Sequence, residues 1–115
     1  MSRRTERVNE LIRKELSLVL ASEVNDPRLP LLVTITSVSV SRDMRYARVS
    51  VSIMGTREEK LSAIGMLQSA SRFLQRRLYP RLALRYVPSL NFQLDESIEE
   101  SMRMFEAIEK LQTSS

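Results

Sequence analysis

The chain has 115 residues, of which 43% are hydrophobic and 28% are charged. This length and balance predict one globular domain over residues 1–115 with a substantial core, and they exclude a disordered chain. The chain has no cysteine, no apolar run of membrane-spanning length and no hydrophobic leader, so we expect a cytoplasmic protein without disulfides or a membrane segment.

The net charge of +4 conceals an uneven distribution of charge along the chain. Residues 1–94 carry 16 basic and 8 acidic side chains, whereas residues 95–115 carry 2 basic and 6 acidic ones. Only three of the 18 cations are lysines. Because guanidinium groups match the geometry of phosphate oxygens, an arginine-rich body predicts a partner that carries phosphate.

The first half of the chain has the pattern of a helix followed by a β-hairpin. Residues 5–22 have the spacing of an amphipathic helix, with a seam formed by Val8, Leu11, Ile12, Leu16, Val19 and Leu20. Residues 31–40 follow as a strand rich in β-branched side chains, in which a bulge near Thr36 and Ser37 would reconcile two parities of alternation. A turn at residues 41–44 leads to a second strand that ends at Ile53, and the two strands are expected to pair as a hairpin.

A long helical stretch occupies residues 60–85. Its apolar residues recur every three or four positions and form one stripe: Leu61, Ile64, Leu67, Ala70, Leu74 and Leu78. We expect the helix to end or restart after Tyr79 and Pro80, because proline cannot donate a hydrogen bond to the preceding turn.

The chain closes with a third strand and a last helix. The strand follows Pro88 and alternates through Leu90, Phe92 and Leu94. Ser97 and Glu100 have the spacing of a capping box for the helix, which is expected to turn inward the side chains of Ile98, Met102, Phe105, Ile108 and Leu111. The order α-β-β-α-break-α-β-α predicts an α+β fold.

The main indication of function is a group of arginines with no acidic residue nearby in the sequence to balance their charge. No carboxylate lies between Glu59 and Asp95, and Arg72 and Arg76 share one face of the helical stretch. This pattern predicts a surface that binds phosphate groups. The predicted contacts are Arg72, Arg76, Arg77, Arg81 and Arg85, supported by Arg3, Arg4, Arg7, Arg45 and Arg48.

The sequence has few of the residue types that enzymes commonly use for catalysis. Histidine and cysteine are absent, and two glycines cannot form a phosphate-binding loop. The acidic cluster of Asp95, Glu96, Glu99 and Glu100 is typical of a helix start rather than of a metal site. We therefore expect no enzyme activity, no cofactor, no metal and no small-molecule substrate. Most of the six aromatic residues are expected in the core, which leaves Tyr46 or Tyr79 to stack singly on a base.

A series of short segments resembles the bacterial ribosome-binding factor A family in order and spacing over nearly the whole chain. The segments are Asp26-Pro27-Arg28-Leu29, Ser41-Arg42-Asp43-Met44, Ala47-Arg48-Val49, Ala70-Ser71, Leu84-Arg85, Pro88-Ser89-Leu90-Asn91-Phe92 and Asp95-Glu96-Ser97. The resemblance implies a KH-like fold of type II, with a three-stranded sheet packed on helices, the second strand at its centre and a C-terminal helix. It also implies a monomeric, non-enzymatic factor for ribosome biogenesis. Such a factor binds the 30S subunit and its 16S rRNA, assists late maturation including processing of the 5′ end of that rRNA, and supports growth in the cold.

The chain departs from the family at the kink between the paired helices. The family has an Ala-x-Gly kink there, whereas this chain has Ala70, Ser71 and Arg72. Because arginine favours helix where glycine does not, we expect a straighter helix through these residues. Two other classes stay open: a protein–protein adaptor that uses the acidic C-terminal helix, and, with less support, a metal-dependent nuclease at the acidic cluster.

Overall fold

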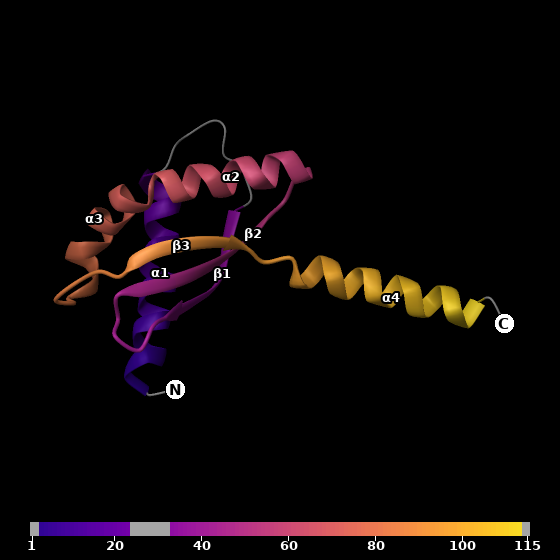
Figure 1. Ribbon diagram of the computed structural model, residues 1–115, viewed down its shortest axis with the longest axis horizontal. Helices are drawn as coiled ribbons and strands as arrows, with labels where there is room; N and C mark the ends of the chain where they lie inside the picture. The colour runs from indigo at the N-terminus through magenta and orange to yellow at the C-terminus, as the bar shows by residue number, and fades with distance from the viewer. Residues whose placement is uncertain (1–2, 24–32, 114–115) are drawn as a thin grey trace.

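The computed structural model describes residues 3–23 and 33–113 of the chain, and Figure 1 shows its helices and strands. The segment of Asp26-Pro27-Arg28-Leu29 lies outside these residues. The elements in chain order are α1 (Arg3–Glu23), β1 (Val33–Val40), β2 (Tyr46–Ile53), α2 (Arg57–Ser69), α3 (Ser71–Leu82), β3 (Ser89–Leu94) and α4 (Ser97–Thr113). The predicted α+β order is therefore confirmed.

The sheet has the order β1-β2-β3, with β2 at its centre as expected. β1 and β2 form the predicted antiparallel hairpin, and β3 runs parallel to β2. The predicted bulge is present, because the register shifts between Ile35, which pairs with Val51, and Ser37, which pairs with Ser50. Thr36 is the extra residue, and its hydroxyl oxygen lies 3.2 Å from the Ser50 carbonyl oxygen.

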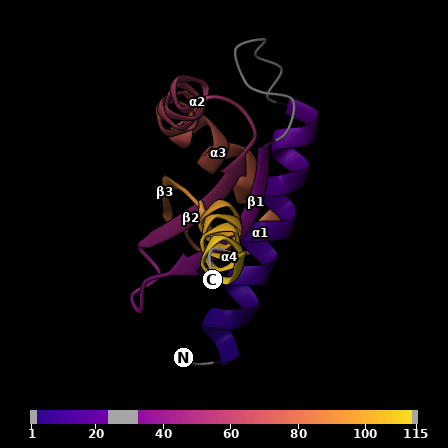
Figure 2. The ribbon, with the colours of Figure 1, turned by 90° about the vertical axis from the view of Figure 1, so that its right-hand side faces the viewer.

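One face of the sheet is covered by α1, α2 and α3 (Figure 2). The alternate residues of β2 from Ala47 to Ile53 point into this layer, against Ile12 and Leu16 of α1 and Leu74 of α3. The opposite face of β2 presents Tyr46 and Arg48, both exposed. Burial of this apolar face against three helices is the main stabilising contribution to the fold.

The expected straighter helix through residues 70–72 is wrong, because the chain breaks at Ala70 between α2 and α3, although Arg72 itself is helical as expected. Ala70 has φ −87° and ψ 4°, and its N–H still donates to the Met66 carbonyl oxygen at 3.0 Å. The break has a tertiary cause: α2 packs on β3, whereas α3 packs on both β3 and α1. A straight helix cannot satisfy both sets of contacts.

The last turn of α3 also differs from the prediction, since the helix passes through Pro80 and ends at Leu82. Pro80 lacks the N–H that would reach back one turn, but Leu78 and Leu82 are buried on either side of it and hold the turn against the core. Ala83 then ends the helix in the left-handed conformation, with φ 47° and ψ 32°.

The C-terminal helix α4 does not turn its apolar side inward, contrary to the prediction. It extends away from the sheet and the other helices (Figure 1), and all five residues of its expected buried stripe are exposed. Ser97 is the first residue of α4 rather than its cap, and its N–H donates to Asp95 Oδ1 at 3.0 Å. A capping box is present instead at α2, between Thr56 and Glu59. Within residues 3–23 and 33–113, no helix combines the length and apolar character needed to cross a bilayer.

Candidate nucleic-acid interface

The exposed arginines Arg72 and Arg76 lie one turn apart on the outer face of α3. They line a shallow pocket together with Gln75, Tyr79 and Val87. The Gln75 side chain donates to the Val87 carbonyl oxygen at 2.8 Å, which holds the loop after α3 against this helix. The guanidinium groups of Arg72 and Arg76 therefore lie beside the exposed Tyr79 ring. The loop at Val87 borders the same pocket.

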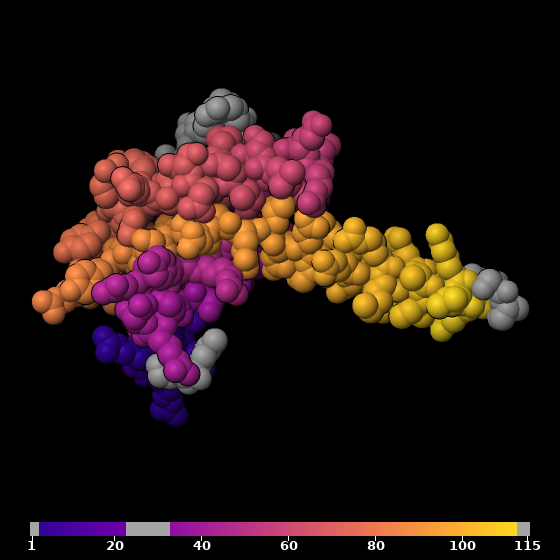
Figure 3. All heavy atoms as spheres, in the orientation of Figure 1, coloured from indigo at the N-terminus to yellow at the C-terminus, as the bar shows by residue number. Residues whose placement is uncertain are grey.

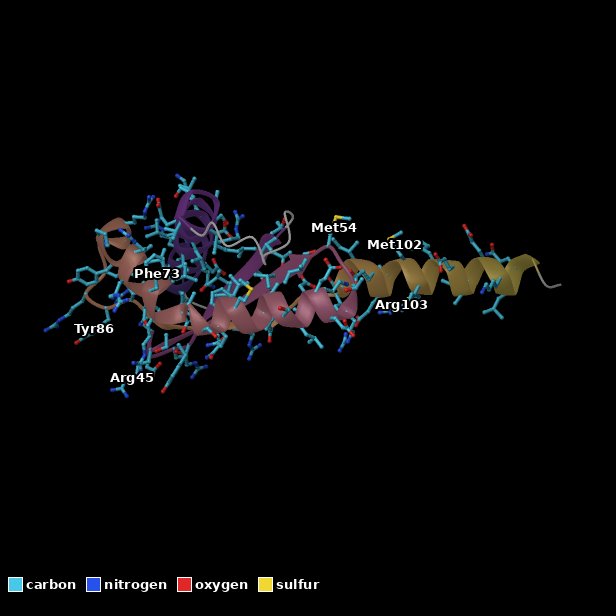
Figure 4. All side chains as sticks on the ribbon, turned by 90° about the horizontal axis from the view of Figure 1, so that it is seen from above. Arg45, Met54, Phe73, Tyr86, Met102 and Arg103 are labelled. Carbon is cyan, nitrogen blue, oxygen red and sulfur yellow. The ribbon has the colours of Figure 1, made fainter. Side chains whose placement is uncertain are left out.

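A second pocket continues from the first, because Val87 lines both. It brings Arg45 and Tyr46 from the hairpin next to Tyr86 from the loop before β3. The N–H of Ser89 donates to the Arg45 carbonyl oxygen at 2.8 Å and joins the two segments. Figure 4 shows Arg45 and Tyr86 projecting outward at the same end of the molecule. In the space-filling view of Figure 3, the hairpin and the start of β3 form one surface.

The turn that carries Arg45 is shaped by Asp43. The hydrogen bond from the Ser41 hydroxyl, at 2.7 Å, and then the bond from the Arg45 N–H lower the pKa of Asp43 below its ordinary value. Met44, with φ 62°, completes this turn in the left-handed region. The Asp43 carboxylate therefore serves as an acceptor within the turn, and the positive charge of Arg45 also contributes to its lowered pKa.

Three tyrosines are exposed along the two pockets, of which Tyr46 and Tyr79 were predicted as single stacking residues and Tyr86 was not. Tyr46 is 56% exposed, Tyr79 is 58% exposed and Tyr86 is 70% exposed. The expectation that most aromatic residues lie in the core is wrong, since Phe92 is the aromatic residue that the core contains among the described residues. We use the term tyrosine–arginine band for Arg45, Tyr46, Arg72, Arg76, Tyr79, Arg85 and Tyr86.

The band has the chemistry of a surface for unpaired nucleotides. Tyrosine rings stack on bases of any sequence, and arginines contact the phosphates between them. Arg85 lies over the Tyr86 ring, with its guanidinium carbon 5.8 Å from the ring centre, so the cation and the ring form one cation–π pair. The exposure of Tyr86 was not predicted from the sequence, because this residue belongs to no helical or strand pattern of apolar residues. It lies in the loop between α3 and β3.

The remaining arginines predicted on α3 have partners within the protein. Arg77 lies over the Phe73 ring at 5.2 Å, and it has a further interaction in the structure. Arg81 donates to Glu15 of α1 at 3.2 Å, which ties the two helices together. Neither residue is counted in the band, because Arg77 lies over Phe73 rather than over one of the three tyrosines and the ion pair offsets the charge of Arg81.

The supporting arginines at the N-terminus lie apart from α3. Arg3, Arg4 and Arg7 are exposed on the first turns of α1. The side-chain oxygen of Asn9 accepts from the N–H of Val40, at 2.8 Å, so these turns lie near the end of β1. Arg48 lies on the uncovered face of the sheet, opposite Asn91 of β3 in the register.

The acidic cluster before α4 is divided among separate partners. Asp95 accepts from the Thr36 hydroxyl at 2.7 Å, Glu96 pairs with Arg57 at 3.0 Å, and Glu99 pairs with Lys60 at 2.6 Å. In the part of the chain that the structure describes, no three acidic side chains converge as metal ligands. The cluster acts as the attachment of α4.

The fold and the exposed band together define a KH-like α+β protein with a basic, tyrosine-containing surface. The sequence profile of the family described as ribosome-binding factor A matches residues 4–108. A ribosome-binding factor A from Acetivibrio thermocellus is 47% identical over 96 residues, which are 84% of this chain and 78% of that protein. The chain belongs to the ribosome-binding factor A family.

Solved structures agree with this assignment. The crystal structure of ribosome-binding factor A from Thermus thermophilus has a TM-score of 0.66 and 28% identity, and the match covers 78% of this chain and 94% of that one. A homology model of the Thermus thermophilus protein, as fitted into the cryo-electron microscopy map of a complex with the 30S subunit, has a TM-score of 0.62. That match has 28% identity and covers 75% of this chain and 89% of the fitted one.

Proposed function

We propose that this chain is a non-enzymatic assembly factor that binds the free 30S subunit through its 16S rRNA. The tyrosine–arginine band carries the proposal, because it presents phosphate-binding and base-stacking groups from three separate segments on one surface. Family membership supports the ribosome as the partner, and the Thermus relative fitted on the 30S subunit supports the small subunit.

The mode of binding follows from the chemistry of the band. Phosphate contacts position a protein on RNA without reading its sequence, and tyrosine rings stack on any base. Specificity must then come from the shape of an irregular or single-stranded part of the rRNA. We propose that Arg72 and Arg76 contact phosphates while Tyr79 and Tyr86 stack on unpaired bases.

The biological role is proposed from the family. The chain acts as one KH-like domain and as a monomer in the cytoplasm, assists late maturation of the small subunit, including processing of the 5′ end of 16S rRNA, and supports growth in the cold. The role requires no catalytic group on the chain, and the carboxylates that a nuclease would need are engaged in attaching α4.

The test reverses the two adjacent charges on α3. Arg72→Glu with Arg76→Glu is expected to abolish co-sedimentation with purified 30S subunits, while thermal stability changes little because exposed charges contribute little to folding. The control is Arg13→Glu with Lys14→Glu, which makes the same change in net charge on α1, outside the band. Equal binding by the wild type and the α3 variant would exclude the band as the docking surface.

A second candidate function is a protein–protein adaptor. The exposed apolar side of α4 favours it, since isolated proteins seldom leave such a surface in water without a partner. The two functions are compatible, because α4 and the band occupy different parts of the molecule (Figure 1).

A further inference from the structure

Helix α4 exposes a continuous apolar face along its whole length. The large apolar residues on it are between 46% and 74% exposed: Ile98, Met102, Met104, Phe105, Ile108 and Leu111. Their spacing of three and four places them on one side of the helix, and Arg103 and Glu106 fall on the other. A 17-residue helix is about 25 Å long, so this face has the dimensions of a ligand helix that fits a protein groove.

Polar contacts at the base of α4 join the helix to the rest of the molecule. The ammonium group of Lys60, whose side chain is only 12% exposed, lies 2.6 Å from Glu99 in the first turn of α4. Arg57 pairs with Glu96 at 3.0 Å, and Asp95 is held by Thr36 of β1. These contacts join α4 to both α2 and the sheet, so that its apolar face is presented away from the core.

The apolar face continues onto the body at Met54, which is 67% exposed at the end of β2. Figure 4 shows Met54 on the same side of the base of α4 as Met102, and Arg103 on the opposite side. Flexible, polarisable methionine side chains adapt to the shape of a partner surface. The surface formed by Met54 and the apolar residues of α4 is here called the α4 face.

The charges on α4 narrow the choice of partner. The helix carries four glutamates against Arg103 and Lys110, whereas residues 1–94 carry an excess of cations. Carboxylates are repelled by RNA phosphates and by anionic lipid surfaces, and membrane-surface helices carry lysine and arginine instead. Glu109 falls beside Met102 and Phe105 on the helix surface, so in a pair of α4 helices it would be brought against the apolar face or the carboxylates of a second copy.

We propose that the α4 face docks into an apolar groove with a lysine- and arginine-rich rim on a protein of the small ribosomal subunit. This inference rests on the proposed function for the location of the partner. The band contacts rRNA, and α4 contacts a basic protein that lies beside that rRNA. Glutamates of α4 pair with the cations of the rim, while Phe105 and Ile108 enter the apolar floor.

The first test measures the affinity of the full chain for purified 30S subunits and, separately, for protein-free 16S rRNA. Phe105→Glu with Ile108→Glu is expected to weaken binding to subunits by at least about tenfold and to leave binding to protein-free rRNA unchanged, because only the α4 contact is lost. Arg103→Glu makes the same change in net charge on the other side of α4 and is expected to leave both affinities unchanged. Circular dichroism checks that each variant keeps its helix content.

The outcomes separate this inference from the proposed function. Unchanged binding of the Phe105 and Ile108 variant to subunits would overturn docking through α4 and leave the function of the band intact. An equal loss for Arg103→Glu would also overturn it, because general repulsion would then explain the effect. A wild-type chain that binds neither subunits nor rRNA would overturn the proposed function itself, and the inference with it.

The second test identifies what lies against the α4 face. A photoreactive benzophenone amino acid at position 105, in the full chain bound to purified subunits, is expected to form an adduct with a protein of the subunit. The same group at position 103 is expected not to form this adduct. An adduct with rRNA or with a second copy of the chain, or no adduct at position 105, would show that the proposed partner is wrong.

Discussion

Two residues at opposite ends of α3 differ in their response to glycine. Ala83 ends the helix with a positive φ of 47°, a conformation that costs an L-residue about 1–2 kcal/mol and glycine almost nothing. Ala83→Gly is therefore expected to raise the free energy of unfolding by about 1 kcal/mol, measured by urea titration. A lower stability would mean that the side chain of Ala83 contributes more than the backbone strain costs.

Arg72 is the matched control for that substitution. It is the second residue of α3, and among the described non-glycine residues positive φ occurs at Met44 and Ala83 only. Arg72→Gly is therefore expected to lower the free energy of unfolding by roughly 0.5–1 kcal/mol, because glycine favours the unfolded chain. The break between α2 and α3 lies at Ala70, not at Arg72, so glycine at position 72 relieves no strain. A gain in melting temperature would contradict this assignment.

At the scale of elements, the attachment of α4 depends on an ionised Asp95. Hydrogen bonds from the Ser97 side chain, from the Thr36 hydroxyl and from the Ser97 N–H lower its pKa below the ordinary value of 3.8. Because the folded-state pKa is depressed, the stabilisation is fully present above that value and is lost as the pH falls below it. Acid should therefore loosen the junction between β3 and α4.

Asp95→Asn keeps the shape of the side chain and removes its charge, so this variant can be compared with the wild type. The wild type is expected to be the more stable protein at pH 7, and the difference in urea midpoint is expected to shrink as the pH falls below 3.8. Titration of the Asp95 carboxyl carbon by NMR measures the pKa directly. A difference that stays constant between pH 7 and pH 2.5 would show that ionised Asp95 does not hold the junction.

At the scale of the whole molecule, the band predicts how binding depends on salt. If Arg45, Arg72, Arg76 and Arg85 each neutralise one phosphate, the affinity for 16S rRNA should fall with salt with a log–log slope of about −3 from this set. Replacing Arg72 by alanine is expected to reduce the slope by about 0.7, measured by filter binding over a series of salt concentrations.

Arg81→Ala is the internal control for that measurement. Its guanidinium group already pairs with Glu15, so its loss should change the slope less than the loss of Arg72. An equal effect of the two substitutions would place Arg81 on the rRNA and extend the binding surface from α3 toward α1.

Much of the fold was predictable because its signals are local. The alternation of β2, the seam of α1 and the bulge at Thr36 depend on side-chain spacing along one segment, and the structure contains all three. The same holds for the exposure of Arg72 and Arg76, which share one face of a helix whose other face is apolar. Of the predicted RNA contacts, these two and Arg45 and Arg85 lie in the tyrosine–arginine band.

The sequence by itself determined the order of the elements, the apolar seams and the excess of arginine, because spacing and composition are properties of neighbouring residues. Only the tertiary structure decided what lies beside what. Tyr46, Tyr79 and Tyr86 come together because β3 pairs with β2 and Gln75 holds the loop at Val87. Amphipathic spacing predicts an apolar side for α4 but not what covers it, and here the ion pairs at its base direct that side away from the core. Long-range contacts therefore decide both proposed surfaces, since a residue's neighbours in space are set by the packing of elements that are distant in the chain.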